Sequence, residues 1–246
     1  MILQIDRGNT RLKWRLRNGP KDIARGVISN IEGYQSLVEE WRQYSIEQIF
    51  VASVLGEEAD LAFAAWAVEQ LGINPRFARA ELRCVGVTNG YRTPEVLGAD
   101  RWLAMLAGYA RTQGACVVAD CGSAITVDLV DQNGMHQGGY IAPGVAAMHN
   151  ALFTNTQGVK TAKALESADL LPGKNTASAV SAAQLVMITG LIRQAMQQVT
   201  ITEDSSEPPM LIMTGGDGVL LSKYFDKALY VPDLVLEGLE LALAAD

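Results

Sequence analysis

The order of hydrophobic and polar residues at the start of the chain predicts a run of strands. Residues 2–6 read as a strand, 10–17 as its antiparallel partner, and a third strand is expected near residues 22–28. Gly8 and Asn9 are typical of a tight turn between the first two strands. The chain is therefore expected to open with a hairpin followed by a third strand.

Helical and strand patterns alternate through the rest of the first half. Apolar side chains recur at helical spacing over residues 33–44, which predicts an amphipathic helix. The other predictions are strands over residues 46–54 and 75–80, a helix over 57–71 that ends at Gly72, and a helix that reaches about Gln113. This order is typical of an α/β domain whose sheet is antiparallel at one side.

The second half repeats this plan. Its patterns predict a hairpin over residues 116–131, a strand over 138–144 that breaks into a helix, and a long helix from about Leu185 to Val199. A strand over 210–214, a helix over 218–224, a strand over 228–231 and a helix over 232–244 follow. Residues 154–177 are expected to be mostly loop, and the acidic segment 202–209 is the best candidate for disorder. With a boundary at Gly114, residues 1–115 and 116–246 look like duplicated domains.

Both predicted hairpins carry the same short motif. An aspartate ends the first strand, a glycine follows two residues later, and a hydroxyl residue comes soon after: Asp6 with Gly8 and Thr10, and Asp120 with Gly122 and Ser123. A glycine turn lets backbone N–H groups approach a phosphate closely, and a carboxylate beside it suits a hydrated metal ion. Two such hairpins facing each other would make a nucleotide cleft between two related domains.

Composition and charge are those of a soluble enzyme. Hydrophobic residues make up 49% of the 246 residues and charged residues 19%, which is enough for a substantial core. The formal net charge of −7 argues against nucleic acid as a general partner. No apolar run approaches the roughly 20 residues of a membrane span, and the chain starts in a strand pattern without a leader. We therefore expect a cytoplasmic protein with no membrane partner.

The cysteines and histidines limit the metal chemistry. Cys84, Cys116 and Cys121 form no paired spacing and are expected to be reduced, buried thiols. His136 and His149 are the only histidines, which excludes a histidine-rich zinc site. A divalent metal should therefore be Mg²⁺ or Mn²⁺, held by oxygen ligands.

Several motifs in register resemble those of one enzyme family. They are Asp6-x-Gly8-Asn9-Thr10, Gly98-Ala99-Asp100-Arg101, Asp120-x-Gly122-Ser123-Ala124 and Gly138-Gly139-x-Ile141-x-Pro143-Gly144. In this combination the chain resembles the type III pantothenate kinases, which share a superfamily with acetate kinase, sugar kinases and actin. The resemblance implies two duplicated actin-like (ribonuclease H-like) domains, each a mixed sheet with helices, with the active site in the cleft between them. It also implies ATP-dependent phosphorylation of pantothenate to 4'-phosphopantothenate, the first step of coenzyme A biosynthesis, by a homodimer that uses Mg²⁺ and K⁺ or NH₄⁺.

The resemblance assigns the first hairpin to ATP. Asp6 would hold Mg²⁺, directly or through water, against the phosphates, and Lys13 could reach a phosphate from the adjoining strand. The ATP-binding residues that it implies are Asp6, Arg7, Gly8, Asn9, Thr10, Arg11, Leu12, Lys13 and Ser123. Two alternatives stay open here. The hairpin could be an ordinary turn after a solvated aspartate, and the Arg7 side chain could lie beside the phosphates or point to solvent.

Asp100 is the candidate catalytic base. Phosphoryl transfer to an alcohol needs a carboxylate that accepts the hydroxyl proton and aims the oxygen at the γ-phosphorus. Its neighbour Arg101 offers a planar fork suited to a substrate carboxylate, and pantothenate carries one. The alternative is an aspartate at a helix N-terminus followed by an arginine packed on Trp102.

The remaining site residues come from the resemblance alone. The implied substrate-binding residues are Tyr91, Gly98, Ala99, Asp100, Arg101 and Thr176. Asp120 matches the monovalent-cation ligand and Ser123 a nucleotide-phosphate contact. Thr154 and Thr156 lie in a segment that could reach a partner subunit's site, and Gly215-Gly216 resembles the adenosine-side turn, with an ordinary strand-to-helix turn as its alternative.

Two other functions compete with the kinase assignment. The chain could be a catalytically silent accessory or regulatory protein of the same fold, or a kinase for another small hydroxy acid or sugar. The three carboxylates Asp6, Asp100 and Asp120 favour an active enzyme, because a silent protein has no need of them all. The segment from Tyr91 to Arg101 favours pantothenate as the acceptor.

Overall fold

The computed structural model describes residues 1–155, 169–199 and 208–243 and divides into two compact units. Unit 1 comprises Met1–Ala110 and Asp233–Asp246, and unit 2 comprises Arg111–Pro232. The predicted second domain, residues 116–246, differs from this division because the end of the chain packs with unit 1.

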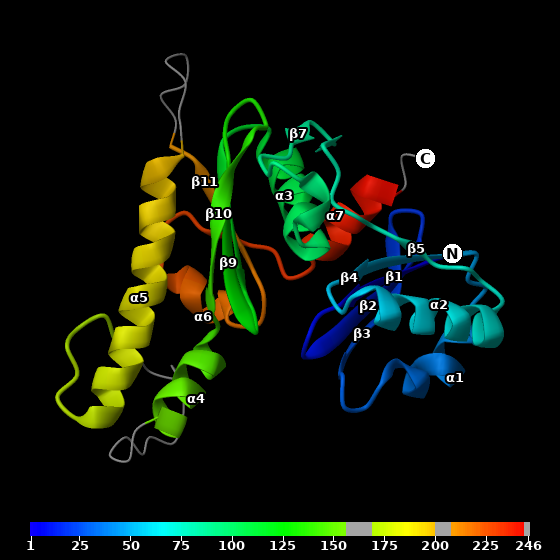
Figure 1. Ribbon diagram of the computed structural model, residues 1–246, viewed down its shortest axis with the longest axis horizontal. Coiled ribbons are helices and arrows are strands. Elements are labelled where there is room, and N and C mark those ends of the chain that lie inside the picture. The colour runs from blue at the N-terminus through cyan, green and yellow to red at the C-terminus, as the bar shows by residue number, and fades with distance from the viewer. Residues whose placement is uncertain (156–168, 200–207, 244–246) are drawn as a thin grey trace. The chain divides into compact units, whose positions relative to one another are not determined.

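Unit 1 is built on a mixed five-stranded sheet in the order β3-β2-β1-β4-β5 (Figure 1). The strands are β1 (Ile2–Arg7), β2 (Arg11–Asn18), β3 (Lys21–Ser29), β4 (Gln48–Ser53) and β5 (Arg76–Phe77). β1 pairs antiparallel with β2, as predicted for the hairpin, and parallel with β4. The other elements are η1 (Tyr34–Leu37), α1 (Val38–Trp41), α2 (Glu57–Leu71), β6 (Arg83–Cys84), β7 (Val87–Thr88), η2 (Pro94–Val96), α3 (Ala99–Thr112) and α7 (Leu234–Leu243).

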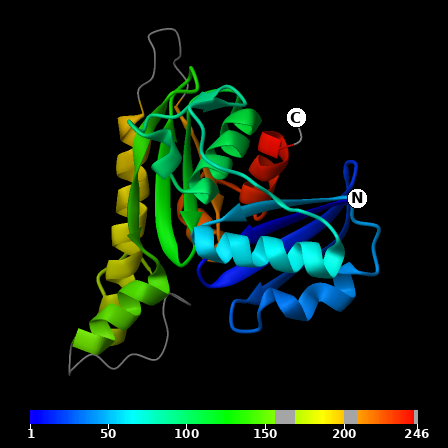
Figure 2. The same ribbon diagram turned by 45° about the vertical axis from the view of Figure 1, so that its right-hand side comes forward.

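The two faces of this sheet are covered by different helices. In Figure 2, α1 and α2 lie on one face and α7 on the other. Leu3 and Ile5 of β1 face α1 and α2 and share a core with Trp41 and Phe63. Because side chains alternate along a strand, Gln4 and the other even-numbered residues of β1 face α7.

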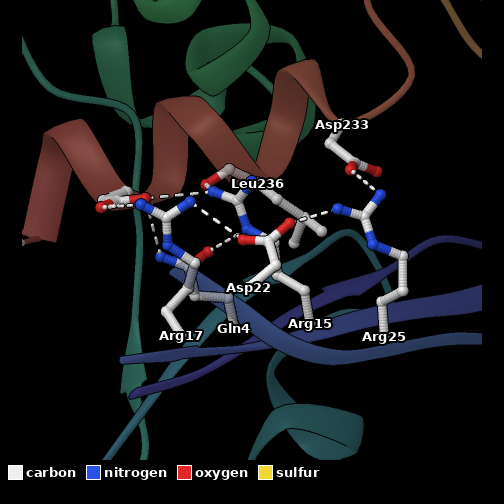
Figure 3. A network of polar contacts seen from close by, with 8 residues as sticks. Gln4, Arg15, Arg17, Asp22, Arg25, Asp233 and Leu236 are labelled. Carbon is white, nitrogen blue, oxygen red and sulfur yellow. Dashed lines mark hydrogen bonds and ion pairs between the residues drawn. The ribbon is translucent and has the colours of Figure 1, made fainter. Parts of the chain in front are cut away.

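A polar network fastens α7 to β1, β2 and β3 (Figure 3). Arg15 Nε donates to Gln4 Oε1 at 2.5 Å, and Arg15 Nη2 donates to Glu240 Oε2 and to the Leu236 carbonyl, each at 3.1 Å. Further ion pairs join Arg17 to Glu240 and Asp22, and Arg25 to Asp22 and Asp233. These contacts explain why the last helix belongs to the first unit.

Unit 2 repeats the topology of unit 1. Its sheet has the order β10-β9-β8-β11-β12, and β8 again pairs antiparallel with the next strand and parallel with the fourth. The elements are β8 (Cys116–Cys121), β9 (Ala124–Val130), β10 (His136–Pro143), α4 (Val145–Asn155), α5 (Thr176–Gln198), β11 (Met210–Thr214), α6 (Gly218–Leu221), η3 (Ser222–Tyr224) and β12 (Leu229–Tyr230). The expected duplication is therefore present as two mixed sheets with matching strand order.

Three predicted segments differ from the structure. Residues 33–44 form the short helices η1 and α1 rather than one amphipathic helix. The long helix begins at Thr176, well before Leu185, because Asn175 forms a capping box with Ser178. Of residues 154–177, only the described ones can be compared, and Thr154 and Thr176 lie in helices rather than loop.

The helix α5 also corrects one expectation about hydropathy. It is the one helix in the described ranges that is long and apolar enough to cross a membrane by length and composition. Its Leu185, Ile188 and Ile192 lie in the core of unit 2, which is also how the core helix of a soluble domain behaves. Length and composition alone therefore give only weak support for a membrane span.

Candidate active site

The first hairpin places a carboxylate and an ammonium group on one face. Asp6 and Lys13 are directly opposite each other in the register of β1 and β2, and side chains of such a pair share a face of the sheet. The Gly8 N–H donates to the Arg11 carbonyl at 3.1 Å and closes the turn. Leu12 is buried in the core, so it could serve ATP only through its backbone.

The Arg7 side chain does not point to solvent, which was one of the two alternatives that the sequence left open. Its side chain is 4% exposed, and its Nη1 donates to Asp60 Oδ1 at 3.3 Å and to the Ala59 carbonyl at 3.2 Å. The guanidinium also lies 4.7 Å from the ring centre of Phe63 and 5.4 Å from that of Tyr34. Burial lowers the pKa of Arg7, and the Asp60 charge opposes this shift. Arg7 therefore ties the end of β1 to α2 and does not carry its charge to solvent.

Asn30 supports the first turn, a role that no sequence pattern indicated. Its side-chain Nδ2 donates to the carbonyls of Gly8 at 2.9 Å and of Asn9 at 2.8 Å. Its backbone N–H donates to the Thr10 carbonyl at 3.0 Å. Three consecutive carbonyls of the turn are therefore bound by one residue at the end of β3.

The predicted acceptor-binding residues of unit 1 lie together at the start of α3. Arg101 Nη1 donates to the Tyr91 hydroxyl at 2.9 Å, and the guanidinium lies 5.6 Å from the centre of that ring. Asp100 is in the first turn of α3, where its Oδ1 accepts the Arg101 N–H at 2.7 Å. A Cβ on Gly98 would lie 2.7 Å from Asp100 Oδ1, so a side chain there would displace the carboxylate.

Asn89 holds the loop that carries Tyr91. It is 4% exposed, its Oδ1 accepts the Tyr91 N–H at 3.0 Å, and its Nδ2 donates to the Pro94 carbonyl at 3.3 Å. An asparagine that bonds the backbone two residues on is a known turn former, so the Asn89-Gly90 pair was a readable signal. The side chain fixes the loop between β7 and η2.

A cavity of about 380 Å³ borders the same segment of unit 1. Leu97 and Ala99 line one part of it, and Asp60 and Arg79 line another. Arg79 Nη2 donates to Asp60 Oδ2 at 2.8 Å while its side chain remains 55% exposed. This volume is within the range of small-molecule pockets.

The second hairpin is enclosed by backbone. The Gly122 N–H donates to the Ala124 carbonyl at 3.0 Å, and the Gly144 N–H donates to the Ser123 carbonyl at 3.1 Å. Gly215 has a φ of +83°, and a Cβ on it would lie 2.5 Å from Asp120 Oδ1. Gly144 is therefore packed against the turn at Gly122 and Ser123, and Gly215 is packed against Asp120.

Cys121, which follows Asp120, is a buried thiol. Burial raises its pKa to about 12, and the charges of Asp120 and Asp217 add to the shift. Burial likewise raises the pKa of Cys116 to about 12, although a hydrogen bond from Thr112 opposes it. Cys84 is only half-buried, so the expected burial is seen fully at two of the three positions.

The other predicted threonines lie in unit 2. Thr176 is the exposed first residue of α5. Thr154 is exposed on α4, where its hydroxyl donates to the Asn150 carbonyl at 2.9 Å. Thr156 is outside the described residues.

The donor set fits a hard cation that is shared with a nucleotide. Within the described ranges, no group of three or more His, Cys, Asp or Glu side chains could hold a metal ion. A magnesium ion bound by one carboxylate, water and substrate phosphates needs no such cage. Asp6, which has Lys13 across the hairpin, is suited to that arrangement.

The fold matches solved structures of actin-like proteins. A putative 2-dehydro-3-deoxygalactonokinase from Sinorhizobium meliloti superposes with a TM-score of 0.61 at 14% identity, covering 100% of this chain and 99% of that chain. A putative Baf family transcriptional activator from Campylobacter jejuni has a TM-score of 0.64 at 23% identity, over 97% and 95% of the two chains. At these identities the likeness shows the fold alone, which is that of the actin-like kinases and ATPases.

Sequence comparison identifies the family. The model described as type III pantothenate kinase matches residues 2–198. Type III pantothenate kinase from Cellvibrio japonicus (strain Ueda107) is 36% identical over 98% of this chain and 96% of its own length. The enzyme of that name from Pseudomonas paraeruginosa is 34% identical over 98% of both chains. This chain belongs to the type III pantothenate kinase family, and the predicted fold class and enzyme class are confirmed.

Proposed function

We propose that this protein transfers the γ-phosphoryl group of ATP to the terminal hydroxyl of pantothenate. Family membership supports the reaction. The main structural support for the acceptor site is the contact between Arg101 and Tyr91 beside Asp100. Three of the expected acceptor-binding side chains therefore lie together at the start of α3. The product is 4'-phosphopantothenate, which enters coenzyme A biosynthesis.

Asp100 acts as the base in this proposal. Its carboxylate accepts the proton of the hydroxyl, the hydroxyl oxygen forms a bond to the γ-phosphorus, and the bond to the β-phosphate oxygen breaks to release ADP. Gly98 leaves space for the carboxylate in this position. Arg101, held by the Tyr91 hydroxyl, is oriented to bind the carboxylate of pantothenate.

Each hairpin has its own set of ligands in this proposal. Asp6 binds Mg²⁺, directly or through water, and Lys13 and the Gly8–Thr10 backbone bind phosphate. When bound, the metal neutralises charge on the phosphates. Ser123 donates to a phosphate, and Asp120 binds K⁺ or NH₄⁺ beside the backbone of Gly215.

A cytoplasmic homodimer completes the proposal. Val186 and Met187 are apolar side chains on α5 that are 48% and 55% exposed, which suits a surface that a second copy covers. Thr176 begins the same helix and is the proposed substrate contact of unit 2.

Substitution of the base tests the mechanism. Asp100→Asn keeps the shape of the side chain but cannot accept the proton, so kcat should fall by roughly 10²–10⁴. ATP binding, measured by calorimetry, should stay within a factor of two. Asp226→Asn is the matched control, because Asp226 is an exposed aspartate with no role in this account. Full activity in Asp100→Asn would remove this residue from the mechanism.

A further inference from the structure

The turn of the first hairpin is shaped by a side chain that comes from a different strand. β3 ends at Ser29, and the next residue, Asn30, reaches the turn between β1 and β2. Its amide group has two hydrogens, so it can satisfy the carbonyls of Gly8 and Asn9 at once, at 2.9 and 2.8 Å. Both distances are those of good N–H···O hydrogen bonds.

These two bonds fix the direction in which the turn presents its amides. In a trans peptide, the carbonyl of one residue and the N–H of the next point to opposite sides of the chain. The Gly8 and Asn9 carbonyls point to Asn30, so the N–H groups of Asn9 and Thr10 point away from it. Consecutive N–H groups that share a direction form a concave anion-binding surface.

We propose that Asn30 is a positioning residue that orients the Asn9 and Thr10 amides toward the phosphates of ATP. This inference rests on the proposed ATP-binding role of the first hairpin. Asn30 touches neither ATP nor the acceptor in this scheme, and it acts through the peptide planes of the turn. Its backbone bond to the Thr10 carbonyl holds the third plane and also extends the pairing of β2 with β3.

A purely structural role predicts a different outcome. Asn30 is exposed, and an exposed hydrogen bond adds little to the stability of the fold. If Asn30 served only to end β3, its loss would change thermal stability slightly and leave all kinetic constants unchanged. If it orients the amides, its loss should weaken the binding of ATP alone.

The test compares Asn30→Ala with Asn18→Ala. Asn18 is also exposed and lies at the other end of β2, so its replacement is a matched control. We expect Asn30→Ala to raise the Kd for Mg–ATP and the KM for ATP about tenfold, which corresponds to about 1.4 kcal/mol. The KM for pantothenate should change by less than a factor of two, and Asn18→Ala should match the wild type.

Direct titration with Mg–ATP separates this inference from the proposed function. If pantothenate is not phosphorylated but the Kd for Mg–ATP still rises tenfold in Asn30→Ala, the positioning role stands and only the acceptor assignment fails. A Kd within a factor of two of the wild type overturns the positioning role. An equal rise in the KM values of ATP and pantothenate, with a lowered Tm, also overturns it, because that pattern indicates general loosening of unit 1.

Discussion

The two hairpins have the same motif, but the second turn is one residue shorter and the two are supported differently. The first turn is held by the side chain of Asn30, whereas the second is packed against the backbone at Gly144 and Gly215. The residue opposite the aspartate also differs, since Lys13 pairs with Asp6 and Thr126 with Asp120. A cationic partner suits phosphates with their divalent metal, and a hydroxyl suits a weakly bound monovalent cation. The duplicated motif has therefore acquired two chemical environments.

The position after each aspartate shows the same divergence. Arg7 and Cys121 both continue the inward-facing row of their strand, as the alternation of side chains requires. Arg7 is buried against α2 with an ion pair to Asp60, and Cys121 is part of an apolar core. The residue after the aspartate can therefore be part of a buried ion pair in one unit and a small apolar side chain in the other.

The largest expected difference is between Asp6→Asn and Asp120→Asn. Loss of Asp6 should lower kcat/KM for ATP by about 10- to 100-fold, as for other groups that hold a metal through water. Loss of Asp120 should mainly abolish the preference for K⁺ over Na⁺. Initial rates measured against Mg²⁺ and against K⁺ distinguish the two roles. The same response in both variants would show that the hairpins are functionally equivalent.

Gly215→Ala tests the close backbone packing of the second hairpin. The new Cβ would meet Asp120 and the Cys121 backbone in a left-handed conformation, so the free energy of unfolding should fall by about 3 kcal/mol. Urea denaturation measures this change. Gly190→Ala in α5 is the control, because no atom lies within 4 Å of its added Cβ and it should stabilise the helix by up to about 1 kcal/mol. Equal stability of the two variants would contradict the packing described here.

Arg7→Met tests whether Arg7 is structural. It removes the hydrogen bonds to Asp60 and Ala59, although Arg79 still pairs with Asp60. We expect the free energy of unfolding to fall by about 2 kcal/mol. The KM for ATP should change less than twofold. A tenfold rise in this KM at unchanged stability would show that the Arg7 charge serves the phosphates after all.

The smallest expected difference is in thiol reactivity, which is measured by labelling and does not depend on an activity assay. With pKa values of about 12, Cys116 and Cys121 carry almost no thiolate at pH 8, so only Cys84 should react in the folded protein. Titration with a chromophoric disulfide should release one equivalent, and three after denaturation. The Cys84→Ser variant should release none while folded. Rapid reaction of Cys121 would mean that the second hairpin is open to solvent.

Local patterns predicted the helices and strands that contain the site better than they predicted the residues that hold the site in place. The period-two alternation of Leu3, Ile5 and Arg7 already places Arg7 on the core face, so its burial was predictable and was missed. The start of α5 was also readable from Asn175 and Ser178, which form the capping box. These signals lie within a few residues of each other in sequence.

Other features depend on contacts that no local pattern contains. Asn30 meets the first turn only because β2 and β3 pair in one particular register. The position of α7 depends on pairs such as Arg15 with Glu240, which lie 225 residues apart. The sequence predicts which residues carry the chemistry, and the register and the long-range ion pairs determine what holds them in place.

Identification of the phosphorylated product tests the central claim most directly. The protein is incubated with Mg–ATP, K⁺ and, in turn, pantothenate, other small hydroxy acids and sugars, and the products are identified by mass spectrometry. The account predicts a product about 80 Da heavier than pantothenate, which is the mass of one added HPO₃ group. This product should form faster than that of any other acceptor and should be lost in Asp100→Asn. Preferential phosphorylation of another acceptor, or ADP release that does not depend on pantothenate, would contradict it.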